Sequence, residues 1–115
     1  MSDHLQTLPL EISVNDVCGL IQSNQDFLLL DCREQEEYNT AAIAGSMLIP
    51  MGQLGERLHE IESHRDQRII VHCHHGVRSL HVVNALRGAG FDKSQSMAGG
   101  IDAWSQEVDQ TVPRY

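Results

Sequence analysis

The sequence predicts an α/β fold in three layers, α/β/α, built around a five-stranded and mostly parallel sheet. Short apolar runs alternate along the chain with amphipathic stretches, and this order is typical of βα units. The run "DFLLLD" (26–31) is apolar between polar ends, as expected for a strand buried on both faces of a parallel sheet. Together these observations favour parallel strands covered by helices over a β-sandwich.

Each expected strand is a short apolar run, and each expected helix carries apolar residues at helical spacing. The strands are expected at 8–12, at 26–31, within 44–51, at 67–73 and at 95–97. The helices are expected from Ser13 onward, within 33–43, at 55–64, at 78–90 and at 101–108. Their core faces are formed by Val14, Val17, Leu20 and Ile21, by Leu58 and Ile61, and by Leu80, Val83 and Leu86.

Residues with helix-capping tendencies mark the ends of several of these helices. Ser13 is an N-cap with an acid three residues later, at Asp16. The helix 78–90 is closed by Gly88 or Gly90, because glycine tolerates the left-handed conformation that ends many helices. The acidic side chains Glu34, Glu36 and Glu37 resemble a carboxylate pair for acid–base chemistry, but we interpret them as the acidic first turn of a helix.

Length and composition exclude several classes of protein. A chain of 115 residues indicates one domain, 1–115, with its core at about 8–107 and a C-terminal tail, 108–115, that lies loosely on the surface. A net charge of −8 argues against nucleic-acid binding, which requires clustered Lys and Arg. No apolar run is long enough for a membrane segment or a signal peptide. Three irregularly spaced cysteines make no disulfide framework, so a reducing, cytoplasmic location is expected.

The stretch "VHCHHGVRS" (71–79) is the candidate active site. Cys73 falls where a strand ends, and ligands of parallel sheets bind beyond the carboxyl ends of the strands. Gly76 allows the next residues to curl back, and a curled loop that leads into a helix directs several backbone N–H groups at one point. With Arg78 at the helix start and a hydroxyl from Ser79, this loop suits a nucleophilic cysteine that stays negatively charged.

A metal site is the first alternative for this stretch, and the spacing disfavours it. His72, Cys73, His74 and His75 are consecutive, and neighbouring side chains on a strand point to opposite faces. Structural zinc sites separate their ligands into pairs instead. We therefore expect no metal and no cofactor, with His72 as a packing residue and His74 and His75 at the rim of the site.

Cysteine-dependent phosphatases are the second alternative, because their loop also runs from His-Cys to Arg followed by Ser or Thr. That loop is one residue longer than the present one. Here four residues separate Cys73 from Arg78, namely His74, His75, Gly76 and Val77. A shorter loop makes a tighter ring of amides, which suits a single sulfur atom better than a tetrahedral phosphate.

Three motifs together resemble a single-domain rhodanese, a member of the rhodanese-like sulfurtransferase family. The loop is one of them. The upstream segment "LLLDCREQEEYNTAAIAGSMLIP" (28–50) carries the matching residues Asp31, Arg33, Glu37, Tyr38, Ile43, Gly45, Ile49 and Pro50. The downstream segment "MAGGIDAWS" (97–105) carries Gly99, Gly100 and Trp104. The resemblance covers about residues 8 to 107.

The resemblance implies transfer of a sulfane sulfur from a donor, thiosulfate or similar, to a nucleophilic acceptor through a cysteine persulfide. Cys73 matches the persulfide cysteine, and residues 74–78 match the loop whose amides hold the outer sulfur. Arg33 matches an arginine that braces the loop by pairing with Asp31 or Glu37. Acceptors of this class are a thiol, cyanide or a carrier protein.

The sequence leaves the donor and one rival function open. His74 and His75 stand where members that favour thiosulfate carry Arg or Lys, so thiosulfate is not established as the natural donor. The alternative function is a non-catalytic rhodanese-like module that binds a partner or senses oxidants. Such modules usually lack the cysteine, and Cys73 is present, so we rank this function second.

The two other cysteines differ in their position relative to Cys73. Cys18 lies on or beside an apolar helix face and is interpreted as packing. Cys32 follows Asp31 at a strand end, on the same rim as Cys73. Either it resolves the persulfide as a disulfide, or it is a small side chain packed behind the rim, which is the favoured interpretation.

Overall fold

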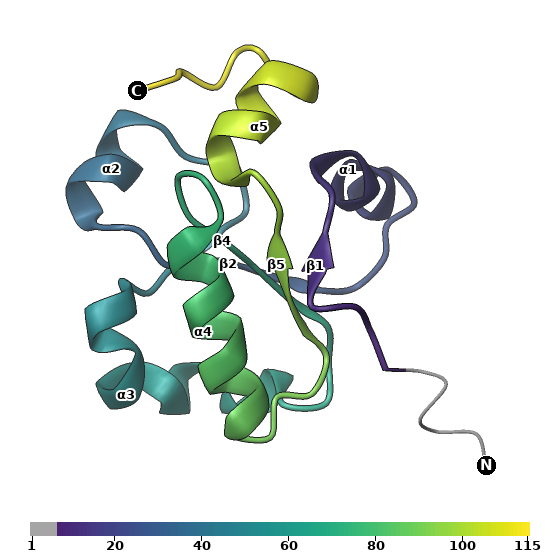
Figure 1. Ribbon diagram of the computed structural model, residues 1–115, viewed down its shortest axis with the longest axis vertical. Coiled ribbons are helices and arrows are strands. Elements are labelled where there is room, and N and C mark those ends of the chain that lie inside the picture. The colour runs from purple at the N-terminus through teal and green to yellow at the C-terminus, as the bar shows by residue number, and fades with distance from the viewer. Residues whose placement is uncertain (1–6) are drawn as a thin grey trace.

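The computed structural model describes residues 7–115 as one sheet covered by helices on both faces (Figure 1). The strands are β1 (Glu11–Ile12), β2 (Leu28–Asp31), β3 (Met47–Leu48), β4 (Ile69–His72) and β5 (Ser94–Met97). Their order in the sheet is β1-β5-β4-β2-β3, and every neighbouring pair is parallel. The predicted α/β class and five-stranded parallel sheet are therefore confirmed.

The helices follow the strands along the chain. They are α1 (Val14–Gln22), α2 (Gln35–Thr40), α3 (Leu54–Arg57), α4 (Val77–Gly88) and α5 (Gly100–Glu107), with 3-10 segments η2 (Met51–Gln53) and η3 (Leu58–His64). The helix expected at 55–64 is thus divided between α3 and η3. The Ser13 hydroxyl accepts a hydrogen bond from the Asp16 amide, as predicted for the N-cap of α1.

Two apolar clusters, one on each face of the sheet, make up the core. Side chains of successive strand residues alternate between them, so Leu29 and Ile70 join one cluster while Leu30 and Val71 join the other. The first cluster contains residues of α1 and α5, and the second contains residues of η3 and α4. Ile21, which was expected on the core face of α1, is 43% exposed in the last turn of that helix.

The C-terminal tail is packed against the domain, so the expectation that 108–115 lies loosely on the surface is wrong. Val112 is 8% exposed and belongs to the first apolar cluster. The Ser105 hydroxyl of α5 donates to the Val112 carbonyl. From there the chain runs towards α2, where it ends in Figure 1. The tail therefore brings its last residue close to the carboxyl ends of the strands.

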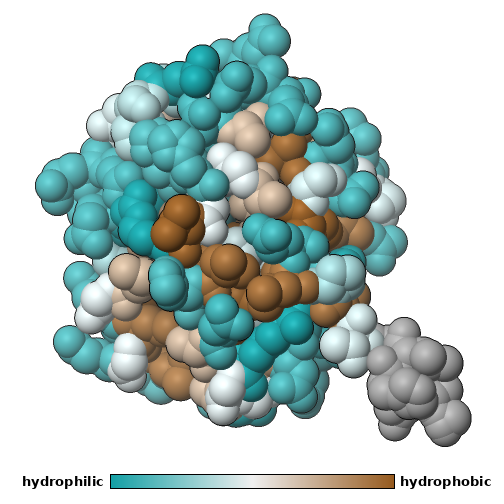
Figure 2. Space-filling view, viewed as in Figure 1, coloured by the Kyte–Doolittle hydropathy of each residue, from teal (hydrophilic) through white to brown (hydrophobic). Residues whose placement is uncertain are grey.

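The surface around α4 is partly apolar. Figure 2 shows hydrophobic side chains between α3 and α4, where a groove is lined by Met51, Leu54, Leu58, Val82 and Ala85, among others.

Within residues 7–115, no helix combines the length and the apolar character that a membrane crossing requires.

Candidate active site

The Cys73 sulfur lies at the end of β4, within a ring of hydrogen-bond donors from the loop that follows. Its Sγ accepts hydrogen bonds from the Gly76 amide at 3.1 Å and from the Ser79 amide at 3.3 Å. The Ser79 hydroxyl lies 3.4 Å from Sγ and also contacts the Ser96 hydroxyl. Cys73 is 1% exposed, so these donors act on the sulfur with little competition from water.

Gly76 gives the loop its curled shape. Its φ of +105° lies in the left-handed region, and it is the N-cap of α4. A Cβ at this position would also stand 3.3 Å from the Gly99 amide nitrogen. The twelve-residue helix α4 therefore begins beside the sulfur, and the positive end of its dipole favours a negative charge there.

The N-terminus of α5 holds the loop from its other side. The Ile101 amide donates to the Cys73 carbonyl at 2.9 Å, and the Asp102 amide donates to the His74 carbonyl at 3.1 Å. Gly100 has φ +62°, and a Cβ there would stand only 2.5 Å from the Cys73 carbonyl oxygen. This close approach of two backbones is the physical reason for glycine in the downstream motif.

The environment of Cys73 favours a thiolate. Its pKa lies well below the ordinary range of a thiol, first because the Cys32 side chain lies beside it and then because Ser79 and Gly76 provide hydrogen bonds. These contacts outweigh burial, which acts in the opposite direction. The pKa of Cys32 is raised by the same neighbouring sulfur and by burial. At neutral pH Cys73 is therefore a thiolate beside a protonated Cys32.

Arg33 is buried and paired with Asp31, one of the two partners that the sequence suggested. Both side chains are 0% exposed, and Nη2 lies 2.7 Å from the Asp31 carboxylate. The same guanidinium donates to the backbone carbonyls of Glu37 and Ala41. Arg33 thus fixes the end of β2 to α2 and to its C-cap, Ala41, and its hydrogen bonds are directed there and at Asp31 rather than at the Cys73 sulfur. It supports the site from behind.

Arg78 faces α2, and its charge is paired. Its two terminal nitrogens donate to the two carboxylate oxygens of Glu37 at 2.7 and 2.9 Å. This contact is the main reason why the pKa of Glu37 is lowered to about 2. Glu37 also forms the capping box of α2 with Glu34, as an acidic first turn should. Its link to the loop was not predicted from sequence, although it stands in the upstream motif.

Tyr115 is a site residue that the sequence did not indicate. Its hydroxyl donates to the Glu37 carboxylate and accepts from Arg33, each at 2.8 Å. Its ring stacks on the His74 ring with centroids 3.9 Å apart and planes 7° apart. A single aromatic residue in a polar tail carries no local pattern that would have revealed these contacts.

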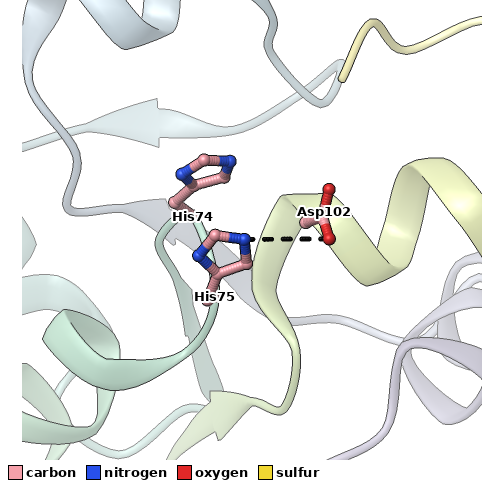
Figure 3. Close-up of side chains that lie close together, drawn as sticks. All are labelled: His74, His75 and Asp102. Atoms are coloured by element: carbon pink, nitrogen blue, oxygen red, sulfur yellow. Dashed lines mark ion pairs between the residues drawn. The ribbon is translucent and has the colours of Figure 1, made fainter. Parts of the chain in front are cut away.

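Asp102 of α5 brings a carboxylate to the two loop histidines (Figure 3). Potential metal-ligand atoms of His74, His75 and Asp102 lie within 4.8 Å of one another, and His75 Nε2 is 3.7 Å from the Asp102 carboxylate. Arg114 already pairs with this carboxylate at 2.9 Å. We interpret the group as a polar contact between the loop, α5 and the tail.

The remaining residues of the stretch lie at the rim or in the core. Val77 is 68% exposed, and the His75 side chain is 62% exposed, so both stand at the rim. His72 is fully buried, its ring nitrogens have no hydrogen-bond partner, and burial lowers its pKa. It is therefore a neutral packing residue on β4.

Comparison with known proteins shows which sequences this chain resembles. Residues 14–107 match the family described as the Rhodanese-like domain. The adenylyltransferase and sulfurtransferase MOCS3 of Arabidopsis thaliana is 30% identical over 96% of this chain and 27% of its own length. The putative sulfur carrier protein YrkF of Bacillus subtilis is 31% identical over 94% of this chain and 57% of its own length.

A solved structure gives the same result at the level of the fold. The crystal structure of a rhodanese-related protein from Thermoplasma volcanium has a TM-score of 0.76 and 32% sequence identity. The match covers 87% of this chain and 94% of that one. With a matching family over most of its length and this near-complete structural relative, the chain belongs to the rhodanese-like domain family.

Proposed function

We propose that this protein, acting as a single domain, is a sulfurtransferase that carries a sulfane sulfur on Cys73 as a persulfide. The observation that carries the proposal is the pair of amide donors around one sulfur, those of Gly76 and Ser79, with the Ser79 hydroxyl 3.4 Å from the same atom. Hydrogen bonds to a charged group stabilise its charged form. The thiolate and the anionic outer sulfur of a persulfide both need such donors.

The transfer takes place in two displacements at sulfur. The Cys73 thiolate attacks the outer sulfur of the donor, and the S–S bond of the donor breaks with its electron pair on the remnant, which is sulfite when thiosulfate is the donor. A second nucleophile then attacks the outer sulfur of the persulfide, and the electron pair returns to Cys73 as a thiolate. This is a ping-pong scheme that uses no metal or organic cofactor.

The charges around the loop favour a donor other than free thiosulfate. Both terminal nitrogens of Arg78 are engaged by Glu37, and the chain has a net charge of −8. A thiosulfate dianion therefore meets amide donors but no unpaired Arg or Lys within the loop 73–79. A donor with a smaller negative charge, such as a low-molecular-weight or protein-bound persulfide, needs fewer positive side chains to bind at this site.

The relatives suggest the class of acceptor. One is named as an adenylyltransferase and sulfurtransferase and another as a putative sulfur carrier protein. Because this chain spans only 27% and 57% of those proteins, it corresponds to one part of each. We infer a carrier protein or a small thiol as the acceptor. Three free cysteines fit a reducing compartment such as the cytoplasm.

The test is sulfur transfer to cyanide, measured as thiocyanate, with thiosulfate and with a persulfide of a small thiol as alternative donors. We expect wild type to form thiocyanate and, when quenched early, to carry one added sulfur atom by intact mass. Cys73→Ala should do neither, whereas Cys18→Ser, which changes a cysteine in the cluster on the other face of the sheet, should behave as wild type.

Two results would contradict this function. If wild type gave no adduct and no thiocyanate with either donor, the non-catalytic binding module would be the better description. If the added sulfur persisted in Cys73→Ala, the persulfide would be carried by another cysteine.

A further inference from the structure

Cys32 and Cys73 are neighbours on adjacent parallel strands. The register of β2 and β4 pairs Asp31 with His72, so the next positions, Cys32 and Cys73, lie side by side. The Cys32 amide donates to the His72 carbonyl at 3.1 Å, which continues the ladder to this point. Neighbouring strands are about 4.8 Å apart, within the range of Cα separations that a disulfide spans.

The two side chains also share one face of the sheet. Both belong to the second apolar cluster, together with Leu30 and Val71, which precede them by two positions. Cys32 is 0% exposed and Cys73 is 1% exposed. Both thiols are therefore shielded from bulk solvent to the same degree, and any sulfur carried by Cys73 lies next to Cys32.

We propose that Cys32 is a resolving thiol, which discharges the Cys73 persulfide as hydrosulfide when no acceptor arrives. This inference rests on the proposed persulfide function. Cys32 attacks the Sγ of Cys73, a Cys32–Cys73 disulfide forms, and the S–S bond of the persulfide breaks. The electron pair of that bond and the proton of Cys32 leave with the outer sulfur as HS⁻. The sulfane sulfur is reduced to sulfide while the two cysteines are oxidised, so no external oxidant is needed.

The protonation states of the pair suit this sequence of events. Because Cys73 holds the negative charge before loading, Cys32 keeps its proton and does not compete for the donor. After loading, the negative charge moves to the outer sulfur, and the Cys32 proton has an acceptor that can leave. A reducing thiol that opens the disulfide returns both cysteines to their starting state. The protein then transfers sulfur while acceptor is present and, when acceptor is scarce, releases the sulfur as sulfide and becomes inactive until it is reduced.

The experiment loads the protein with a persulfide of a small thiol, removes excess donor and follows the protein without acceptor. For wild type we expect the added sulfur to disappear from the intact mass while one equivalent of sulfide is released. The remaining protein should be lighter than reduced protein by two hydrogens, with Cys32 and Cys73 joined in one cross-linked peptide. Dithiothreitol should restore transfer to cyanide.

The variants Cys32→Ser and Cys32→Ala should load sulfur and retain it, with sulfide release slowed at least tenfold. Cys18→Ser is the matched control and should release sulfide as wild type does. A wild-type adduct that persists, or sulfide release from both Cys32 variants at the wild-type rate, would overturn the inference and leave the persulfide function intact. If wild type never acquires the added sulfur, both proposals fail.

Discussion

The loop 73–79 and the tail 108–115 meet at the same site but are specified in different ways. In the loop, the Gly76 and Ser79 amides reach a sulfur only three and six positions earlier in the chain. In the tail, the Tyr115 hydroxyl contacts Glu37 and Arg33 across 78 and 82 positions. The loop is therefore set by local spacing, whereas the tail finds its place only once the whole sheet has formed.

This difference separates the region to which we assign the chemistry from one that covers it. The loop supplies the donors that hold the sulfur. The tail places an aromatic ring on His74 and a hydroxyl between Glu37 of α2 and Arg33, which lies between β2 and α2. Substitutions in the loop should therefore change the rate of transfer, and substitutions in the tail should mainly change stability and access.

The largest effect is expected for Gly76→Ala in the loop. A side chain at φ +105° and 3.3 Å from the Gly99 amide should displace the Gly76 N–H from the Cys73 sulfur. Losing one donor to a reacting anion costs about 10²-fold in rate. We expect a loss of that order in kcat/KM for transfer to cyanide, with circular dichroism showing a folded protein.

Gly45→Ala is the matched control, because Gly45 has φ +85° but open space around its Cβ position and no contact with the sulfur. Gly45→Ala should be less stable than wild type but should keep the wild-type rate of sulfur transfer. Equal rates for Gly76→Ala and wild type would show that the curled loop is not needed for transfer.

The next effect is expected for Glu37→Gln, which changes the residue that contacts both Arg78 of the loop and Tyr115 of the tail. The substitution removes the charge that pairs with Arg78, so a thiosulfate dianion should bind more tightly to the loop. We expect the KM for thiosulfate to fall about fivefold, equivalent to about 1 kcal/mol, the size of a partly exposed ion pair. The gain should shrink at high ionic strength.

Glu36→Gln removes the same charge from the same turn of α2, where the side chain is exposed, and serves as the control. If both variants lowered the KM equally, the effect would come from net charge. If neither did, the pairing of Arg78 would not limit thiosulfate binding.

Much of the fold and the core of the site were predictable because their signals are local. The apolar run "DFLLLD" predicted β2, and the Ser13 N-cap predicted the start of α1. The spacing of Cys73, Gly76 and Ser79 placed a thiol in a curled loop at a strand end.

The parts that sequence could not predict depend on long-range contacts. The packing of Val112 and the stacking of Tyr115 on His74 require segments distant in sequence to come together. The pairing of Arg78 with Glu37 joins residues 41 positions apart, and it turns an expected free charge into a structural link. The proximity of Cys32 to Cys73 follows from strand order, which a list of strands does not give.

A smaller effect is expected for Tyr115→Phe in the tail. The variant keeps the ring on His74 but loses the hydroxyl bonds to Glu37 and Arg33. Of these two hydrogen bonds, one is part-buried and the other is exposed, and together they are worth about 1 kcal/mol. We expect unfolding in urea to show a loss of that size, and alkylation of Cys73 to become faster, while kcat for transfer changes little.

Gln110→Ala, a change at an exposed tail residue, is the control and should leave both measurements unchanged. A large fall in kcat for Tyr115→Phe, at unchanged stability, would place the tail within the chemistry and remove the distinction drawn between the two regions.

The smallest change is expected for the pH dependence of Cys73 alkylation. Because the pKa of Cys73 is lowered, the thiolate that reacts is fully present at neutral pH and is lost only as the pH falls through that low value. The rate should therefore vary less than about twofold between about pH 6 and pH 9, whereas an ordinary thiol with a pKa of about 8.5 loses about tenfold per unit below that value.

The same measurement on Cys32→Ala identifies the main cause of the lowered pKa. The neighbouring Cys32 side chain is the largest cause of the lowered pKa, ahead of Ser79 and Gly76. Without the Cys32 side chain, the fall in alkylation rate should begin at a higher pH than in wild type. Tyr115→Phe should keep the flat profile, because no tail residue is among the causes of the lowered Cys73 pKa. Subtracting the Cys73→Ser background removes alkylation at Cys18. A wild-type profile that followed an ordinary thiol would show that the loop does not hold a thiolate.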